Sequence, residues 1–276
     1  MKSEELKQIV KEKYGKIAEQ NSKEEPCGCG TSCCSPEVDY TVFSEDYRNK
    51  EGYNPDADMN LGCGIPTDFA GIKKGDHVLD LGSGAGNDCF VARAIVGETG
   101  KVTGLDMTEQ MIRKAKENCT KLGFTNVEFV PGDIENMPFE KSLFDVVISN
   151  CVLNLVPDKS KAFAEIFRVL KPGGHFCVSD VVIKGTLSEK MVKDAEMYAG
   201  CVSGASEMNE YLKIVEDSGF INVKVHKQKE IRLPDSLLAE FNDPAELNSY
   251  RTGDTGIFSI TVSAERPSVC SCGGTC

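Results

Sequence analysis

The sequence lacks the features that would bring it to a membrane or to nucleic acid. No run of apolar residues approaches membrane-spanning length, and the amino terminus, MKSEELKQIV, is charged from its second residue and has no apolar secretory core. Basic residues are outnumbered, because 31 Lys and Arg stand against 43 Asp and Glu, a net charge of −12. Such a charge repels phosphate backbones and anionic lipids. We expect a cytoplasmic protein that binds neither nucleic acid nor membranes.

Histidine is scarce and cysteine is abundant. His77, His175 and His226 are the only histidines, and they fall at predicted strand positions, which favours structural roles. The 13 cysteines are an odd number, and without a secretory leader we expect reduced thiols, some of them chemically used. They form an N-terminal group, a C-terminal group and six single positions: Cys27, Cys29, Cys33 and Cys34; Cys270, Cys272 and Cys276; Cys63, Cys89, Cys119, Cys151, Cys177 and Cys201.

The apolar pattern predicts an α/β fold. Apolar residues recur at helical spacing over residues 3–20, and residues 21–36 read as a loop. Short β-branched runs then alternate with helical stretches, which predicts a parallel sheet covered by helices on both faces. The expected strands are 77–81, 101–106, 126–130, 144–149, 175–180, 224–233 and 257–265, and the expected helices are 87–97, 108–122, 158–170 and a helical stretch over 188–219.

The length of 276 residues suits one large domain with a smaller appendage. We predict four regions: an N-terminal helix and Cys-rich segment (1–64), a cofactor-binding domain (65–185), a C-terminal region with closing strands (186–266) and a Cys-rich tail (267–276). In a sheet of this type the ligand site lies at the carboxyl ends of the strands.

The strongest motif is VLDLGSGAGND, positions 78–88, where a strand runs into a glycine-rich turn and a helix. Glycine lets the backbone approach a ligand, and a helix N-terminus offers N–H groups to an anion. A plain strand-to-helix turn would explain the loop almost as well. Asp106 favours a cofactor-binding loop over a plain turn, because it ends the next strand 20 residues after Gly86, where a carboxylate can accept both hydroxyls of a ribose. The two features indicate an adenosine-containing cofactor.

The spacing of the glycines argues against a loop that binds a dinucleotide cofactor. Counted from Gly82 and Gly84, the third glycine position of the dinucleotide fingerprint is Asn87. Asp80 would repel a diphosphate but suits a ligand that carries an ammonium group. S-adenosylmethionine has that ammonium, together with a carboxylate for the loop N–H groups.

At residues 65–180 the sequence resembles the class I S-adenosylmethionine-dependent methyltransferases, through LDLGSGAG, GLDMTEQM, PGDIENMPF, FDVVISN and VLKPGG in order. The resemblance implies a Rossmann-like, seven-stranded, doubly wound sheet, here with an N-terminal helical and Cys-rich extension and a smaller C-terminal α+β region. It also implies the residues that contact the cofactor: Asp80, Gly82, Ser83, Gly84, Asn87, Asp106, Met107, Asp133, Ile134 and Asn150.

Three single cysteines have unusual surroundings. Cys151 follows Asn150 at a strand end. Cys63 lies between two glycines in NLGCGIP and Cys201 beside small residues in MYAGCVSGA, and we expect these neighbours to leave both thiols accessible. For Cys89, Cys119 and Cys177 simple burial is the better interpretation. Zinc is the common alternative, but structural zinc sites show closely paired cysteines. One soft trivalent ligand such as As(III), bound at three points, fits the wide separation.

LGCGIP, SNCVLNL and GCVSGASEMNEYLKIVEDSGF resemble motifs of the arsenite S-adenosylmethionine methyltransferases. The resemblance implies that Cys63, Cys151 and Cys201 bind As(III). It also implies that an N-terminal thiol takes part in disulfide exchange, and among the four cysteines there we choose Cys33 and Cys34. A thioredoxin-like or glutathione-type reductant would then restore the thiols. The substrate is then arsenite or thiol-conjugated As(III), and we expect a monomer. Two alternatives stay open: methylation of another small molecule, and a thiol protein that binds metalloids without turnover.

Overall fold

A seven-stranded sheet organises the computed structural model, which describes residues 3–20, 45–193, 204–232, 238–239 and 242–268. The strand order is β3-β2-β1-β4-β5-β7-β6. Strand β7 runs antiparallel to both of its neighbours, whereas β1 to β5 pair in parallel. The strands are β1 (His77–Leu81), β2 (Lys101–Asp106), β3 (Val127–Pro131), β4 (Phe144–Asn150), β5 (Leu170–Lys184), β6 (Ile221–Ile231) and β7 (Gly256–Glu265).

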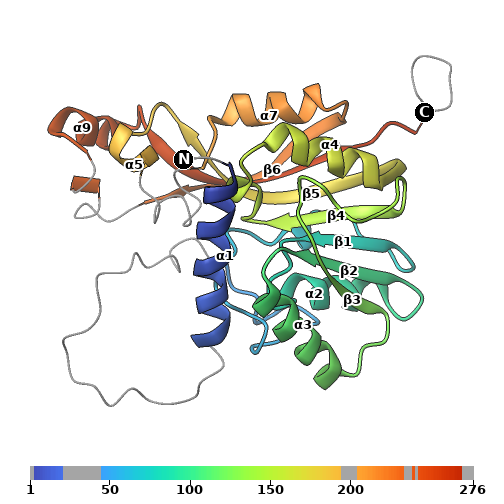
Figure 1. The fold of residues 1–276 in the computed structure, drawn as a ribbon. Helices are drawn as coiled ribbons and strands as arrows, with labels where there is room; N and C mark the ends of the chain where they lie inside the picture. The colour runs from blue at the N-terminus through green and yellow to red at the C-terminus, as the bar shows by residue number, and fades with distance from the viewer. Residues whose placement is uncertain (1–2, 21–44, 194–203, 233–237, 240–241, 269–276) are drawn as a thin grey trace, which may run out of the picture.

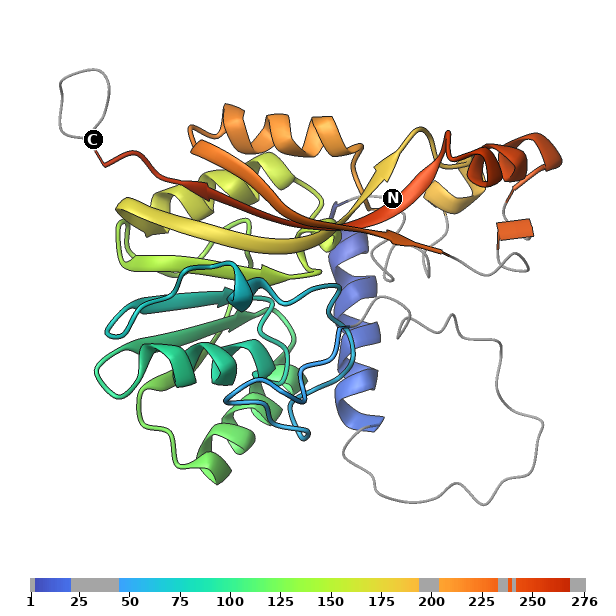
Figure 2. The ribbon, with the colours of Figure 1, turned by 180° about the vertical axis from the view of Figure 1, so that it is seen from behind.

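Helices cover both faces of the sheet (Figures 1 and 2). Apolar residues of α2 (Asn87–Val96) and α3 (Glu109–Leu122) pack in one core cluster, and those of α4 (Lys159–Val169) and α7 (Met208–Asp217) pack in another. Helix α1 (Ser3–Gln20) stands across the edge at which the parallel strands end. The shorter elements are η2 (Pro66–Asp68), η3 (Leu153–Leu155), α5 (Glu189–Lys193) and α9 (Pro244–Thr252).

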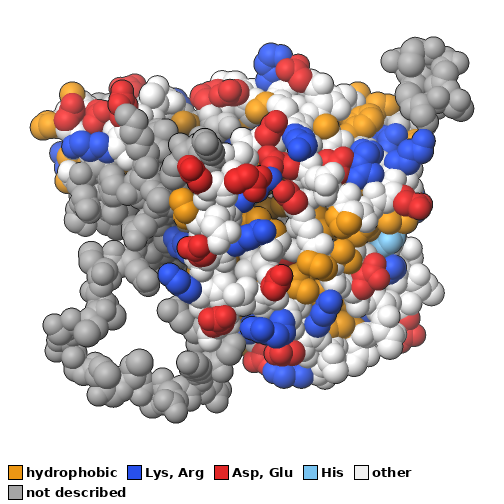
Figure 3. Space-filling view, viewed as in Figure 1, with side chains coloured by type: hydrophobic (Ala, Val, Ile, Leu, Met, Phe, Trp, Pro, Cys, Tyr) orange, Lys and Arg blue, Asp and Glu red, His pale blue; other side chains and the backbone are white. Residues whose placement is uncertain are grey.

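The central strands are apolar because helices cover them on two sides. In β1 every residue after His77 is buried, and β2 is buried from Val102 to Leu105. Continuous apolar runs of this kind are typical of parallel sheets. On the face of the molecule seen in Figure 3, acidic and basic side chains are interspersed. In the described ranges no helix combines the length and the apolar character needed to cross a lipid bilayer.

The predicted fold class is confirmed, with seven strands in one sheet. Two expectations for the C-terminal part were wrong. The helical stretch expected over residues 188–219 is interrupted, because residues 204–207 lie between α5 and α7 without helical structure. Helix α9, which begins with a capping box between Asp243 and Glu246, was not predicted. The residues of the N-terminal cysteine group, Cys201 and the tail cysteines lie outside the described ranges.

Candidate active site

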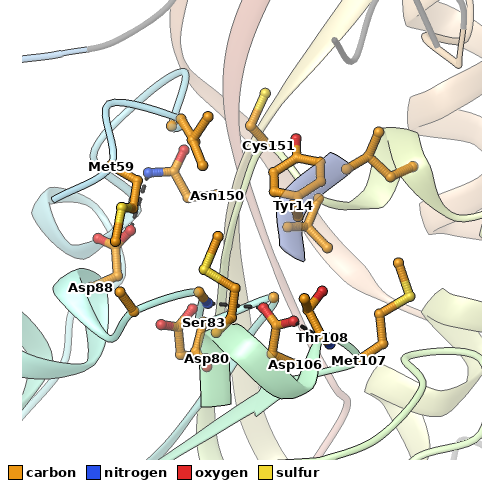
Figure 4. A pocket seen from close by; sticks show the side chains of 18 of the residues that line it. Tyr14, Met59, Asp80, Ser83, Asp88, Asp106, Met107, Thr108, Asn150 and Cys151 are labelled. Atoms are coloured by element: carbon orange, nitrogen blue, oxygen red, sulfur yellow. Dashed lines mark hydrogen bonds between the residues drawn. The ribbon is translucent and has the colours of Figure 1, made fainter. Parts of the chain in front are cut away.

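A pocket opens where the central strands end, and we call it the strand-end pocket (Figure 4). Its floor comes from the glycine loop after β1 and from Asp106 to Thr108 after β2. Residues 150–152 after β4 form one wall, and Lys7, Val10 and Tyr14 of α1 form another. Parallel strands place the residues that follow them at one edge of the sheet, and this is why distant segments meet here.

The glycine loop is fixed by backbone hydrogen bonds to the neighbouring strand. The Gly82 N–H donates to the Leu105 carbonyl at 2.7 Å. The Gly84 N–H donates to Asp106 Oδ2 at 2.9 Å, and the Thr108 N–H donates to Asp106 Oδ1 at 2.8 Å. These bonds fix the Asp106 carboxylate at the floor of the pocket.

Three carboxyl groups give the pocket an acidic character. Burial, followed by the charges of Asp88 and Asp106, holds the pKa of Asp80 well above its usual range. Burial also raises the pKa of Asp88 to about 6 and raises the pKa of Asp106. No salt bridge to these three groups is found among the described residues. A pocket with unneutralised carboxylates in poor contact with water favours a positively charged ligand.

Helix α1 closes the pocket through an ion pair. Lys7 Nζ lies 2.6 Å from Asp133 Oδ2 and also pairs with Glu135. Asp133 Oδ1 accepts the Glu135 N–H at 2.9 Å. Both oxygens of Asp133, the residue expected near the adenine, are therefore engaged in this structure. Apolar groups of Val10, Met107 and Ile134 line the same part of the pocket.

Cys151 lies in the wall of the strand-end pocket in an unusual backbone conformation. Its φ of 60° is in the left-handed region, which side chains other than glycine rarely adopt and which is often found at functional sites. The Cys151 N–H donates to the Ser179 carbonyl at 2.7 Å, and this bond holds the turn against β5. The side chain is 5% exposed and lines the pocket.

Cys63 lies just behind the pocket wall. It packs in the same apolar cluster as Cys151, together with Leu155 and Val181. Its exposed fraction is 0%, so the expectation that the flanking glycines leave it accessible was wrong. The glycines instead let neighbouring groups approach closely. Cys89, Cys119 and Cys177 are buried free thiols, as expected.

The residues predicted to contact the cofactor converge on the strand-end pocket. All ten line it, from the ends of β1, β2 and β4, from the glycine loop and its helix, and from the segment after β3. Cys151 lines it too, whereas Cys63 does not. Cys201, Cys33 and Cys34 lie outside the described residues. The structure therefore brings two of the three proposed arsenic-binding cysteines to one side of the pocket.

Comparison with known proteins gives the family. A family model described as "Methyltransferase domain" matches residues 72–236. The arsenite methyltransferase of Halobacterium salinarum is 36% identical over 96% of this chain and 67% of its own length, and that of Aquipseudomonas alcaligenes is 31% identical over 93% and 71%. The crystal structure of an arsenic (III) S-adenosylmethionine methyltransferase from Chlamydomonas reinhardtii matches with a TM-score of 0.63 at 35% identity, over 76% of this chain and 68% of that chain.

The chain belongs to the arsenite methyltransferase family. It is an S-adenosylmethionine-dependent methyltransferase. A phosphoethanolamine N-methyltransferase from Haemonchus contortus, at 21% identity and a TM-score of 0.58, shares the fold alone.

The residues that line the strand-end pocket fit S-adenosylmethionine, the cofactor of this arsenite methyltransferase family member. The Ser83 Oγ and Asn87 Oδ1 atoms are buried at the pocket without a hydrogen-bond partner among the described residues, and a bound polar ligand would satisfy them. Burial and neighbouring carboxylates raise the pKa of Asp80 and of Asp88, and a cationic ligand would favour the ionised form of both. S-adenosylmethionine carries two positive centres, a sulfonium and an ammonium. The adenine would then lie by Met107 and Ile134.

Sequence reasoning missed three residues of this site, Lys7, Tyr14 and Asp88. Tyr47 and Asp88 line the pocket and hydrogen-bond to each other at 2.7 Å. Asp88 follows Asn87 in the glycine motif, so its position was visible in the sequence. Tyr47 comes from a segment without periodicity, and the contacts of Lys7 and Tyr14 depend on how α1 docks. His77, His175 and His226 bond to groups of the sheet or of the loop before β1, outside the pocket lining.

Proposed function

We propose that the enzyme transfers methyl groups from S-adenosylmethionine to As(III) held by Cys63, Cys151 and Cys201. The observation that carries this proposal is the position of Cys151, in the wall of an acidic strand-end pocket and in a left-handed backbone conformation. Cys63 in the same cluster supplies a second sulfur nearby. The names of the related enzymes support arsenite as the substrate.

Capture of arsenite needs thiols but no external base. Each exchange forms one As–S bond and breaks one As–O bond, and the thiol proton leaves with the hydroxyl group as water. Thiol-conjugated As(III) would release its thiol in the same way. Soft As(III) prefers sulfur over oxygen and nitrogen ligands. The absence of histidine from the pocket lining agrees with this chemistry, since the arsenic lone pair carries no proton.

The chain acts mainly by positioning. S-adenosylmethionine, when bound, would supply a methyl group on a positively charged sulfur. Asp80 and Asp106 would hold its amino-acid and ribose parts, and Cys63, Cys151 and Cys201 would hold the arsenic, whose lone pair is the nucleophile. Holding two reactants in near-attack geometry can lower the barrier by roughly 7–11 kcal/mol.

Repeated turnover requires reduction. Methylation leaves arsenic pentavalent, and two thiolates then supply two electrons, which return it to the trivalent state and join the two sulfurs as a disulfide. Cys33 or Cys34 would accept this disulfide by exchange and pass it to a thioredoxin-like or glutathione-type reductant. Successive cycles would give mono-, di- and trimethylated arsenicals.

Arsenic speciation tests the proposal. The full chain is incubated with S-adenosylmethionine, arsenite and a thiol reductant, and the products are separated and measured. Methylated arsenicals that increase with time support it. If a quinone or phenolic acceptor is methylated and arsenite is not, the enzyme is a methyltransferase of another small molecule. Arsenite binding without any methylated product would indicate a metalloid-binding protein.

A further inference from the structure

A network of hydrogen bonds joins the strand-end pocket to the backbone around Cys63 (Figure 4 shows the part between Asn150 and Asp88). Asn150 Oδ1 accepts the Cys63 N–H at 3.0 Å, and Asn150 Nδ2 donates to the Gly64 carbonyl at 2.8 Å. The same nitrogen lies 3.1 Å from Asp88 Oδ2 and 2.9 Å from the Tyr47 hydroxyl. One amide side chain therefore holds the Gly62–Cys63 and Gly64–Ile65 peptide units, one before Cys63 and one a residue beyond it.

The network has more acceptors than hydrogens. Asn150 Nδ2 has two hydrogens and the Tyr47 hydroxyl has one, while the acceptors are the Gly64 carbonyl, both Asp88 oxygens and the Tyr47 oxygen itself. The shortest contact is the one from the Tyr47 hydroxyl to Asp88 Oδ1, at 2.7 Å. An ionised Asp88 attracts these hydrogens most strongly, because hydrogen bonds to a charged acceptor are about twice as strong as neutral ones. The charge of Asp88 therefore decides how firmly Asn150 is held.

The segment of Cys63 is fitted closely to this amide. A Cβ atom added at Gly62 would lie 2.5 Å from Asn150 Nδ2, so a glycine is needed at this position. The Cys63 carbonyl accepts a hydrogen bond from Ser259 on β7. Because these contacts hold the segment on both sides, a change in the position of Asn150 would displace Cys63 itself.

We infer that Tyr47 and Asp88 are positioning residues for Cys63, which act through Asn150, and that the Asp88 carboxylate couples a cation in the strand-end pocket to the capture of As(III). Asp88 lines the pocket on one side and bonds to the network on the other. This inference rests on the proposed function of Cys63 as an arsenic ligand.

The charges around Asp88 give the direction of the coupling. Burial raises the pKa of Asp88 to about 6, against the hydrogen bonds from Tyr47 and Asn150, and the nearby Asp58 and Asp68 raise it further. A cationic ligand in the pocket favours the ionised carboxylate, which strengthens the bonds that hold Cys63. Cofactor binding should therefore tighten As(III) binding. Because linkage is reciprocal, As(III) should tighten binding of a cationic cofactor analogue by the same factor.

The reciprocal effect can be measured at a single site. Sinefungin, a non-reactive analogue with an amine in place of the sulfonium methyl, is titrated by calorimetry into the full reduced chain with and without saturating arsenite. At a pH of about 5, where a pKa of about 6 leaves most Asp88 carboxyls protonated in the free protein, we expect arsenite to tighten sinefungin binding at least about fivefold in the wild type. In Tyr47→Phe and in Asp88→Asn the ratio should fall below about twofold. Using the ratio removes any direct effect of Asp88 on the analogue.

Two controls separate positioning from general damage. Tyr53→Phe removes a hydroxyl from the same segment and outside the network, and should keep the wild-type ratio. In a Cys63→Ser background the coupling should be absent, and adding Tyr47→Phe should change nothing more. Retained coupling in Tyr47→Phe, or an equal loss in Tyr53→Phe, would overturn the inference.

The inference and the proposed function fail in different ways. If the wild type produces methylated arsenic but shows no coupling, the inference is wrong and the function stands. If no methylated arsenic forms and arsenite leaves sinefungin binding unchanged, both are overturned.

Discussion

The conformation of the glycine loop makes a quantitative prediction for Gly82→Ala. Gly82 has a φ of +65°, and a Cβ atom there would lie 2.2 Å from Val152 Cγ2. The left-handed conformation costs an alanine about 1–2 kcal/mol. Forcing a methyl group into occupied space costs typically about 1–3 kcal/mol. Because the Gly82 N–H is bonded to the Leu105 carbonyl at 2.7 Å, the loop cannot shift freely to relieve the contact. We expect a loss of about 2–5 kcal/mol in the free energy of unfolding.

Two companion variants separate the conformational cost from the steric one. Gly84 also has a positive φ, +52°, but a Cβ atom there meets nothing nearer than Met111 Sδ at 4.0 Å. Gly84→Ala should therefore lose only about 1–2 kcal/mol. Adding Val152→Ala to Gly82→Ala removes the steric contact and should recover part of the loss.

Urea unfolding of the single and double variants provides the measurement. Equal losses in Gly82→Ala and Gly84→Ala, or no recovery on adding Val152→Ala, would refute the steric reasoning. Calorimetric titration of S-adenosylmethionine into the same proteins would show whether Gly84→Ala, which is tolerated sterically by the chain, still obstructs the cofactor.

Further predictions concern the thiols and a buried carboxyl. Cys151→Ser and Cys201→Ser should each lower the first methylation at least about 100-fold, measured by arsenic speciation, and full activity in either would contradict the thiol site. Cys33→Ser and Cys34→Ser should slow arsenite methylation more than methylarsenite methylation, and equal effects would count against a relay. Burial raises the pKa of Asp180 from 3.8 to about 7. The folded state then holds the proton more tightly than the unfolded state, so this carboxyl lowers stability as pH rises from about 4 to about 7 and changes nothing above. Asp180→Asn should remove this pH-dependent loss of stability, which is on the order of 4 kcal/mol. If the free energy of unfolding depends on pH in the same way in the variant and in the wild type, the prediction is wrong.

The sequence predicts the central fold well because the buried strands appear in it as continuous apolar runs. Strands β1 and β2 begin and end where their β-branched runs do, since helices cover them on both faces. Helix α9 escaped prediction because none of its residues is buried, so no apolar stripe marks it. The break before α7 escaped because Glu207 caps that helix through its own side chain, which an apolar pattern does not reveal.

The part of the site that lies at the strand ends can be predicted from the sequence. Asp80 and Asp106 lie next to predicted strands, so a parallel sheet brings them together. Tyr47 and Lys7 reach the strand-end pocket from segments outside the sheet, and only their tertiary packing places them there. The burial of Cys63 was misjudged because its flanking glycines were taken as exposure, whereas Gly62 is needed for close approach to Asn150.

The sulfur coordination of bound arsenic shows whether Cys63, Cys151 and Cys201 together form the arsenic site. X-ray absorption at the arsenic edge, on the full reduced chain with less than one equivalent of arsenite, counts the sulfur and oxygen neighbours of the arsenic atom. We expect three sulfur neighbours in the wild type and the loss of one in Cys63→Ser, in Cys151→Ser and in Cys201→Ser. Unchanged coordination in these variants would mean that the arsenic binds elsewhere and that the three cysteines do not form its site.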